Sequence, residues 1–108
     1  MMGPKRQFEM IYPPIIKQYL KAIEPRYWSF IRDSLEAQLR FEPDSEARNS
    51  KPLKRPAVFG AKWKVRFGPN NRFRAFYRID YGEQEVVILA IGEKTGNRLV
   101  IGGEEIEL

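Results

Sequence analysis

The sequence predicts an α+β fold, in which an N-terminal strand and a helix hairpin pack on a mainly antiparallel β-sheet. Apolar residues recur at helical spacing in the first third of the chain and alternate with polar residues in the second half. Two aromatic-rich strands joined by a short turn are typical of an antiparallel hairpin. With 108 residues the chain should form a single domain, residues 1–108, that buries about two-thirds of its unfolded surface.

The N-terminal third predicts one short strand and two helices. Residues 7–12 alternate between apolar and polar side chains, as in a strand. Pro13 and Pro14 end this strand and are compatible with the first turn of a helix. Pro25 interrupts the helical spacing, so a second helix is expected at about 26–40.

The second half predicts strands. Residues 42–60 contain several prolines and no period, which indicates a loop. Strands follow at about 62–67, 72–81 and 85–91, and the last is a continuous apolar run typical of a central buried strand. Residues 98–101 are compatible with a short extra strand. The expected order is therefore β-α-α-β-β-β.

The turn between the first two of these strands decides which side chains share a face, because side chains alternate along a strand. Pro69, Asn70 and Asn71 favour a three-residue connection, since proline fixes the first backbone angle and asparagine tolerates the left-handed conformation. This register places Arg66 opposite Arg74. A four-residue loop would instead bury alternate arginines among aromatic rings, which is physically unfavourable.

The same register places Lys64 opposite Phe76 and Lys62 opposite Arg78. One face of the hairpin would then carry Lys62, Lys64, Arg66, Arg72, Arg74, Phe76 and Arg78. The other face would carry Trp63, Val65, Phe67, Phe73, Ala75, Tyr77 and Ile79, which the helices would cover. We therefore expect one cationic and one apolar face.

The amino-acid composition limits the catalytic chemistry that the chain could perform. The chain has no Cys and no His, which excludes thiol catalysis, zinc fingers and His-containing triads. We expect neither a metal nor a cofactor. The longest apolar run is far shorter than the roughly 20 residues that a membrane span needs. A cytoplasmic protein without membrane contact is therefore expected.

Positive charge is concentrated in the middle of the chain. Between Arg48 and Arg78 there are ten Lys or Arg residues and no Asp or Glu, whereas residues 79–108 hold two basic and seven acidic groups. Like charges opposite one another destabilise a sheet, so a bound polyanion such as nucleic acid is the expected partner. The alternative is a solvated outer face. The acidic tail, residues 102–108, is expected to be a frayed terminus rather than a cap on the sheet.

Several segments together resemble the RelE/ParE superfamily of toxins from toxin–antitoxin systems. The segments are Lys64-Val65-Arg66-Phe67, Arg72-Phe73-Arg74-Ala75-Phe76-Tyr77 and Val86-Val87-Ile88-Leu89-Ala90-Ile91-Gly92-Glu93-Lys94. The resemblance extends to the helix hairpin and to Pro52-Leu53, and so covers nearly the whole chain. It implies a cognate antitoxin as partner, in a toxin–antitoxin hetero-oligomer. RelE-like members cut mRNA in the ribosomal A site, and ParE-like members inhibit DNA gyrase.

The resemblance also implies catalytic residues. Lys64, Arg66 and Arg74 match basic positions of RelE-like nucleases, and Lys94 lies close to a further one. RelE-like nucleases also carry a C-terminal tyrosine that helps to activate the ribose 2′-hydroxyl, and here no tyrosine follows Tyr81.

The residues themselves suggest how RNA cleavage would proceed. Arg66 and Arg74 would clamp the scissile phosphate. Lys64, crowded by cations, should have a lowered pKa and act as base or acid. The residues expected to bind nucleic acid are Lys51, Lys54, Arg55, Lys62, Arg72, Phe76, Arg78 and Arg98, with Phe76 stacking a base.

Three functions remain open from the sequence. The first is a metal-independent, ribosome-dependent mRNA endoribonuclease that blocks translation. The second is a toxin that inhibits DNA gyrase without cleaving anything, and the third is a nucleic-acid-binding module without toxicity.

Overall fold

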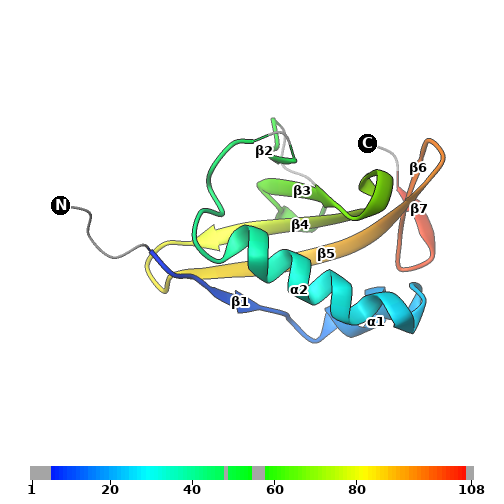
Figure 1. Ribbon diagram of the computed structural model, residues 1–108, viewed down its shortest axis with the longest axis horizontal. Helices are drawn as coiled ribbons and strands as arrows, with labels where there is room; N and C mark the ends of the chain where they lie inside the picture. The colour runs from blue at the N-terminus through cyan, green and yellow to red at the C-terminus, as the bar shows by residue number, and fades with distance from the viewer. Residues whose placement is uncertain (1–5, 48, 55–57, 107–108) are drawn as a thin grey trace.

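The computed structural model describes residues 6–47, 49–54 and 58–106, and over these it is an α+β fold as predicted (Figure 1). The elements are β1 (Glu9–Ile11), α1 (Ile15–Lys21), η1 (Pro25–Tyr27), α2 (Trp28–Leu39), β2 (Ser50–Pro52), η2 (Val58–Gly60), β3 (Trp63–Phe67), η3 (Pro69–Asn71), β4 (Phe73–Asp80), β5 (Glu85–Thr95), β6 (Arg98–Ile101) and β7 (Glu104–Ile106), where η marks a 3-10 helix. None of the helices in these ranges is long and apolar enough to cross a membrane.

The described strands form one sheet in the order β2-β3-β4-β5-β6-β7. The long strand β5 pairs with β4 along one edge and with two strands, β1 and β6, along the other edge. Its start pairs in parallel with β1, and its end pairs antiparallel with β6. All other neighbouring strands are antiparallel, which agrees with the predicted class.

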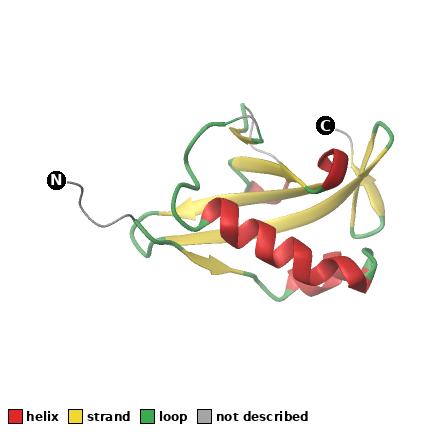
Figure 2. Cartoon of the chain, in the orientation of Figure 1, coloured by secondary structure: helices red, strands yellow, loops and turns green. Residues whose placement is uncertain are grey.

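Both helices pack on one face of the sheet (Figure 2). Helix α2 buries Ile31, Leu35 and Leu39, which recur at the spacing of one helix face. These side chains contact the core-facing residues of the hairpin, among them Val65 and Tyr77. The buried Tyr77 hydroxyl donates a hydrogen bond to the Pro43 carbonyl oxygen at 2.8 Å, which fixes the segment after α2 to the sheet.

A second, smaller cluster of buried side chains lies on the opposite face of the sheet. It consists of Ala61, Phe76, Ala90, Leu99 and Ile101, bordered by the half-buried Tyr19, Leu53, Leu89 and Ile106. Leu89 lies at a bulge, because Phe76 pairs with Ala90 whereas the next residue, Tyr77, pairs with Ile88. The segment between β2 and β3 covers part of this cluster through Leu53 and Ala61, so the face opposite the helices is not uniformly exposed.

The structure adds two short strands to the predicted order. Strand β2 lies inside the expected loop 42–60, where Ser50 pairs with Val65. Strand β7 lies inside the acidic tail and pairs with β6 through a turn at Gly102 and Gly103, both of which have positive φ. The expectation of a frayed terminus is therefore wrong for residues 104–106. Both strands are too short to show a period, so only their pairing identifies them.

We predict that Gly92→Ala destabilises the fold by about 1–3 kcal/mol, because overpacking forces neighbours to shift. A Cβ atom at Gly92 would lie 2.7 Å from Ile101 Cγ1 and 2.8 Å from the Val100 carbonyl oxygen. Urea unfolding would measure the change. The control is Gly82→Ala, whose Cβ would meet only Asp80 Oδ1 at 3.5 Å. Equal stability of the two variants would contradict the prediction.

Candidate functional site

The hairpin has the register that the sequence predicts. Arg66 on β3 pairs with Arg74 on β4, and Lys64 pairs with Phe76. Pro69–Asn71 form η3 at the turn, and Asn70 and Asn71 both have positive φ, near 55°. Arg66 and Arg74 therefore lie on the same face of the sheet, opposite the helices.

Arg74 is a buried cation without a described anionic partner. Only 8% of its surface is exposed, and its Nε has no hydrogen-bond partner. None of the ion pairs found among the described residues includes Arg74. Burial and the nearby Arg66 both lower the pKa of Arg74, which shows that its charged form is disfavoured here. Because an unpaired buried charge is unfavourable, this position is suited to a bound anion.

Lys64 lies beside Arg74 and is itself perturbed. Burial lowers its pKa, and the positive charges of Arg74, Arg66 and Lys51 lower it further, in that order. The prediction of a lowered pKa is confirmed, although burial rather than crowding is the larger cause. Lys51 is brought here by β2, where it pairs directly with Lys64. We call Lys51, Lys64, Arg66 and Arg74 the basic cluster.

On the same face of the sheet, the row of cross-strand neighbours continues beyond Arg74 with Gly92 and then Ile101. Arg74 pairs with Gly92 on β5, and Gly92 pairs with Ile101 on β6. The position at which the RelE-like pattern leads us to expect a tyrosine is thus occupied by the buried aliphatic residues Leu99 and Ile101. They present no hydroxyl group to the basic cluster.

Arg72 lies away from the basic cluster, and its predicted placement on the cationic face is wrong. Its Nε pairs with Glu93, its Nη1 donates to the Tyr27 hydroxyl at 3.2 Å, and its guanidinium lies 4.6 Å from the Tyr27 ring centroid. Tyr27 and Phe73, the other ring beneath Arg72, belong to the helix-side core. Glu93 therefore supplies the carboxylate partner of Arg72, a role that was not predicted from the sequence. Its position directly after Gly92 was the signal in the sequence that could have identified it.

Phe76 does not form an exposed stacking surface, so its predicted contact with a base is wrong. It is 2% exposed, because Ala61, Ala90 and Leu99 surround it in the smaller cluster. Lys62 and Arg78 are exposed at the far end of the hairpin, beyond the last cross-strand pair, Trp63 with Tyr77.

The remaining predicted residues are dispersed. Lys94 is exposed and alternates with Glu93, so it shares the face of Gly92 and the basic cluster. Arg98 precedes Leu99 on β6 and therefore projects from the opposite face. Lys54 is exposed beyond β2, and Arg55 lies outside the described residues.

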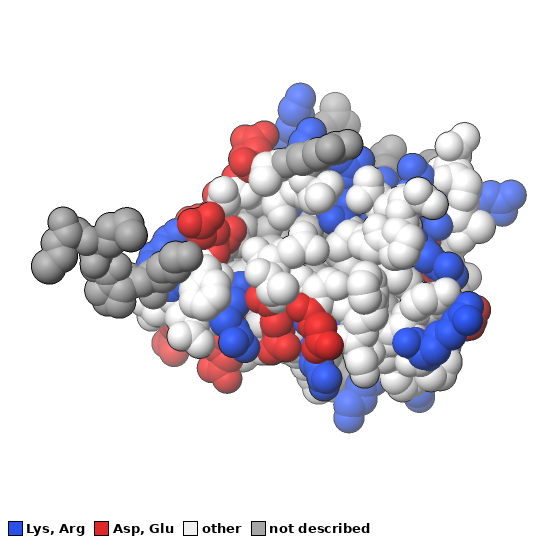
Figure 3. Space-filling model, in the orientation of Figure 1, with Lys and Arg blue, Asp and Glu red and all other residues white. Residues whose placement is uncertain are grey.

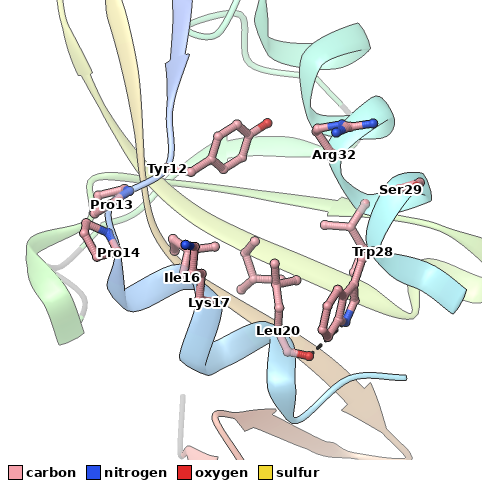
Figure 4. A pocket seen from close by; sticks show the side chains of 11 residues that line it. Tyr12, Pro13, Pro14, Ile16, Lys17, Leu20, Trp28, Ser29 and Arg32 are labelled. Atoms are coloured by element: carbon pink, nitrogen blue, oxygen red, sulfur yellow. Dashed lines mark hydrogen bonds between the residues drawn. The ribbon is translucent and has the colours of Figure 1, made fainter. Parts of the chain in front are cut away.

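A groove of about 360 Å³ separates the two helices (Figure 4). Its lining includes Tyr12, Ile16, Leu20, Trp28 and Ile91, with Lys17 and Arg32 among the charged groups. Trp28 Nε1 donates to the carbonyl oxygens of Leu20 and Ile23, both at 2.9 Å, which ties the two helices together at one end.

Tyr12 carries an unsatisfied hydroxyl in this groove. The buried hydroxyl has no hydrogen-bond partner, and burial raises the pKa of Tyr12 to about 12. Most of the residues that line the groove are apolar. On the molecular face that carries the helices, residues other than Lys, Arg, Asp and Glu cover much of the surface, with acidic and basic groups among them (Figure 3). The groove is therefore a largely apolar surface with one polar group that lacks a partner.

No three acidic side chains gather as metal ligands anywhere in the described ranges. The cations of the basic cluster, with the unsatisfied Nε of Arg74, can support anion binding and proton transfer through Lys64.

The fold and site define a class of small α+β proteins with a basic patch on the sheet face opposite a helix hairpin. No family model matches the sequence, and no curated protein matches it. The structure matches a chain of the toxin–antitoxin complex RelBE2 from Mycobacterium tuberculosis with a TM-score of 0.64 and 25% identity, covering 82% of this chain and 99% of that one. The fold is RelE-like, and the predicted resemblance to the RelE/ParE superfamily is confirmed.

We predict that Lys64→Met stabilises the protein at neutral pH by about 0.5–1 kcal/mol, as is usual when charge crowding is relieved. The folded-state pKa of Lys64 lies below its ordinary value of 10.5, so the unfolded chain binds more protons between these two values. This group therefore makes stability rise with pH in that window. The variant should lose that alkaline rise.

Urea unfolding between pH 7 and 11 would test this prediction. Lys62→Met is the matched control, because Lys62 is exposed at the end of the hairpin. A stability loss at pH 7 in Lys64→Met, with none in the control, would contradict it.

Proposed function

We propose that the chain is the toxin of a toxin–antitoxin system, and that it cleaves mRNA on the ribosome. The observation that carries the proposal is Arg74, a buried arginine with an unsatisfied Nε next to Lys64 and Arg66. A phosphate diester supplies the charge and the acceptor oxygens that this group lacks. The match to a chain of a toxin–antitoxin complex supports the toxin role.

The proposed reaction is attack of the ribose 2′-hydroxyl on the adjacent phosphate. Arg66 and Arg74, paired across the hairpin, would bind the phosphate oxygens and stabilise the charge that develops in the transition state. Lys64 would give or accept the proton, because its pKa is shifted from that of an ordinary lysine toward neutral pH. This reaction proceeds without a metal.

Inhibition of DNA gyrase is the second candidate. The observation that favours it is the absence of a tyrosine beside the basic cluster, where Leu99 and Ile101 are buried. A nucleic-acid-binding module without toxicity would use the same cations and is the third candidate.

We further propose that an antitoxin binds in the groove between α1 and α2. The groove is largely apolar, and Lys17 and Arg32 belong to its lining. An antitoxin segment with apolar anchors and flanking carboxylates would fit these properties. The oxygen or amide of such a segment would also satisfy the Tyr12 hydroxyl.

Induced expression tests the main proposal. We expect growth and protein synthesis to stop at once, with mRNA cut within codons. Arg74→Ala and Lys64→Ala should each lower cleavage in a ribosome-containing translation extract by about 100-fold or more, the usual effect of losing one transition-state contact. The matched control is Arg98→Ala, which removes the same charge from the opposite face.

Other outcomes would support one of the other two candidate functions. Replication arrest with intact mRNA would indicate gyrase inhibition, and unimpaired growth would leave the non-toxic module. Full cleavage by both Arg74→Ala and Lys64→Ala would remove the basic cluster as the site.

The groove is tested by co-expression with the cognate antitoxin. We predict that Leu20→Glu weakens antitoxin binding by at least about 1–3 kcal/mol, because it places a charge where apolar contact is required, and that growth arrest persists despite the antitoxin. Gln18→Glu, an exposed change of equal charge on the same helix, should remain neutralised. Equal neutralisation of both variants would contradict the groove as the binding site.

A further inference from the structure

Phe59 has a conformation that the fold alone does not explain. Its φ is 73°, in the left-handed region that side chains other than glycine, asparagine and aspartate rarely occupy. The residue is also 43% exposed, so its burial offsets this strain only in part. Residues held in such conformations are concentrated at functional sites.

The position of Phe59 is nevertheless defined. It lies in η2, followed by Gly60, which also has a positive φ of 75°. Its ring packs against the ring of Tyr19 from α1, with centroids 5.9 Å apart and an interplanar angle of 66°. One edge of Phe59 is therefore supported by a second aromatic ring, while much of its surface remains open to solvent.

Phe59 and the basic cluster lie on the same side of the sheet. Ala61, two residues after Phe59, is buried in the smaller cluster with Phe76 and Ala90, and Phe76 is the direct partner of Lys64. Lys64, Phe76 and Ala90 occupy successive strands, which places Lys64 roughly 10 Å from Ala90 across the sheet. Because Ala61 packs in the same cluster as Phe76 and Ala90, Phe59 lies beside this row, on the side of the sheet that carries the basic cluster.

We propose that Phe59, supported by Tyr19, stacks against a base of the single-stranded RNA whose phosphate binds the basic cluster. This inference rests on the proposed function and adds the residue that contacts the base. Exposed aromatic rings beside a positively charged path are the usual means by which proteins hold single-stranded nucleic acid. The sequence assigned this role to Phe76, whose ring is buried, whereas Phe59 presents an accessible ring on the same face.

Binding of a single-stranded RNA hexamer to the purified protein tests the proposal. We expect Phe59→Ala and Phe59→Leu to weaken binding roughly ten-fold, and Phe59→Trp to retain it, because stacking requires an aromatic ring. Phe41→Ala is the matched control, since Phe41 is 41% exposed and follows helix α2. It should bind the hexamer like the unchanged protein.

Two further measurements separate stacking from a structural role. Phe59→Gly should lose RNA binding while its thermal stability falls no further than that of Phe59→Ala, because glycine adopts this φ without strain. Hexamers that carry one abasic nucleotide should, at one position, remove the difference between Phe59→Ala and the unchanged protein. A 2-aminopurine at that position should be quenched by the unchanged protein and not by Phe59→Ala.

The outcomes distinguish this inference from the function on which it rests. If the unchanged protein binds RNA, Arg74→Ala does not, and Phe59→Ala binds normally, then the stacking role is wrong and the phosphate site stands. If the unchanged protein binds no hexamer but cleaves mRNA in the ribosome-containing extract, the stacking inference is wrong and the proposed function stands; if it does neither, both proposals are wrong. If Phe59→Ala unfolds and Phe59→Gly binds RNA normally, Phe59 is structural and the inference is overturned.

Discussion

The structure depends on one unfavourable arrangement, the placement of Arg74 opposite Arg66 with Arg74 almost fully buried. Like charges facing one another across a sheet oppose its formation, so other interactions must fix this register. The turn at Pro69–Asn71 does so locally, with two asparagines in the left-handed conformation. The packing of the helix-side core does so globally, because a shift of one residue would turn every buried ring of the hairpin toward solvent.

This arrangement also confines the site to a small part of the sheet. Beyond Arg74 the row continues with Gly92, which has no room for a side chain, and then with the buried Ile101. In the neighbouring row Phe76 is covered by the segment between β2 and β3. The four cations of the basic cluster are thus gathered at β2, β3 and β4, and Lys94 lies apart from them on β5.

The parts of the fold and site that could be predicted are those that local sequence determines. The helix hairpin follows from apolar spacing, and the pairing of Arg66 with Arg74 follows from the turn residues between them. Arg72 and Phe76 could not be placed in this way, because their surroundings come from distant segments. Glu93 pairs with Arg72 from β5, and Ala61 and Leu99 enclose Phe76 from other elements. Lys51 joined the cluster through β2, which is too short for any period to show.

For the proposed RNA cleavage, the surroundings of Lys64 influence whether it donates or accepts the proton. Burial and three neighbouring cations lower its pKa. A bound phosphate would neutralise part of that positive field and raise the pKa again. A higher pKa favours the protonated form of Lys64, which suits an acid that protonates the leaving oxygen. The two arginines would favour loss of the proton from the attacking hydroxyl to water, a step that requires no tyrosine at the position of Ile101.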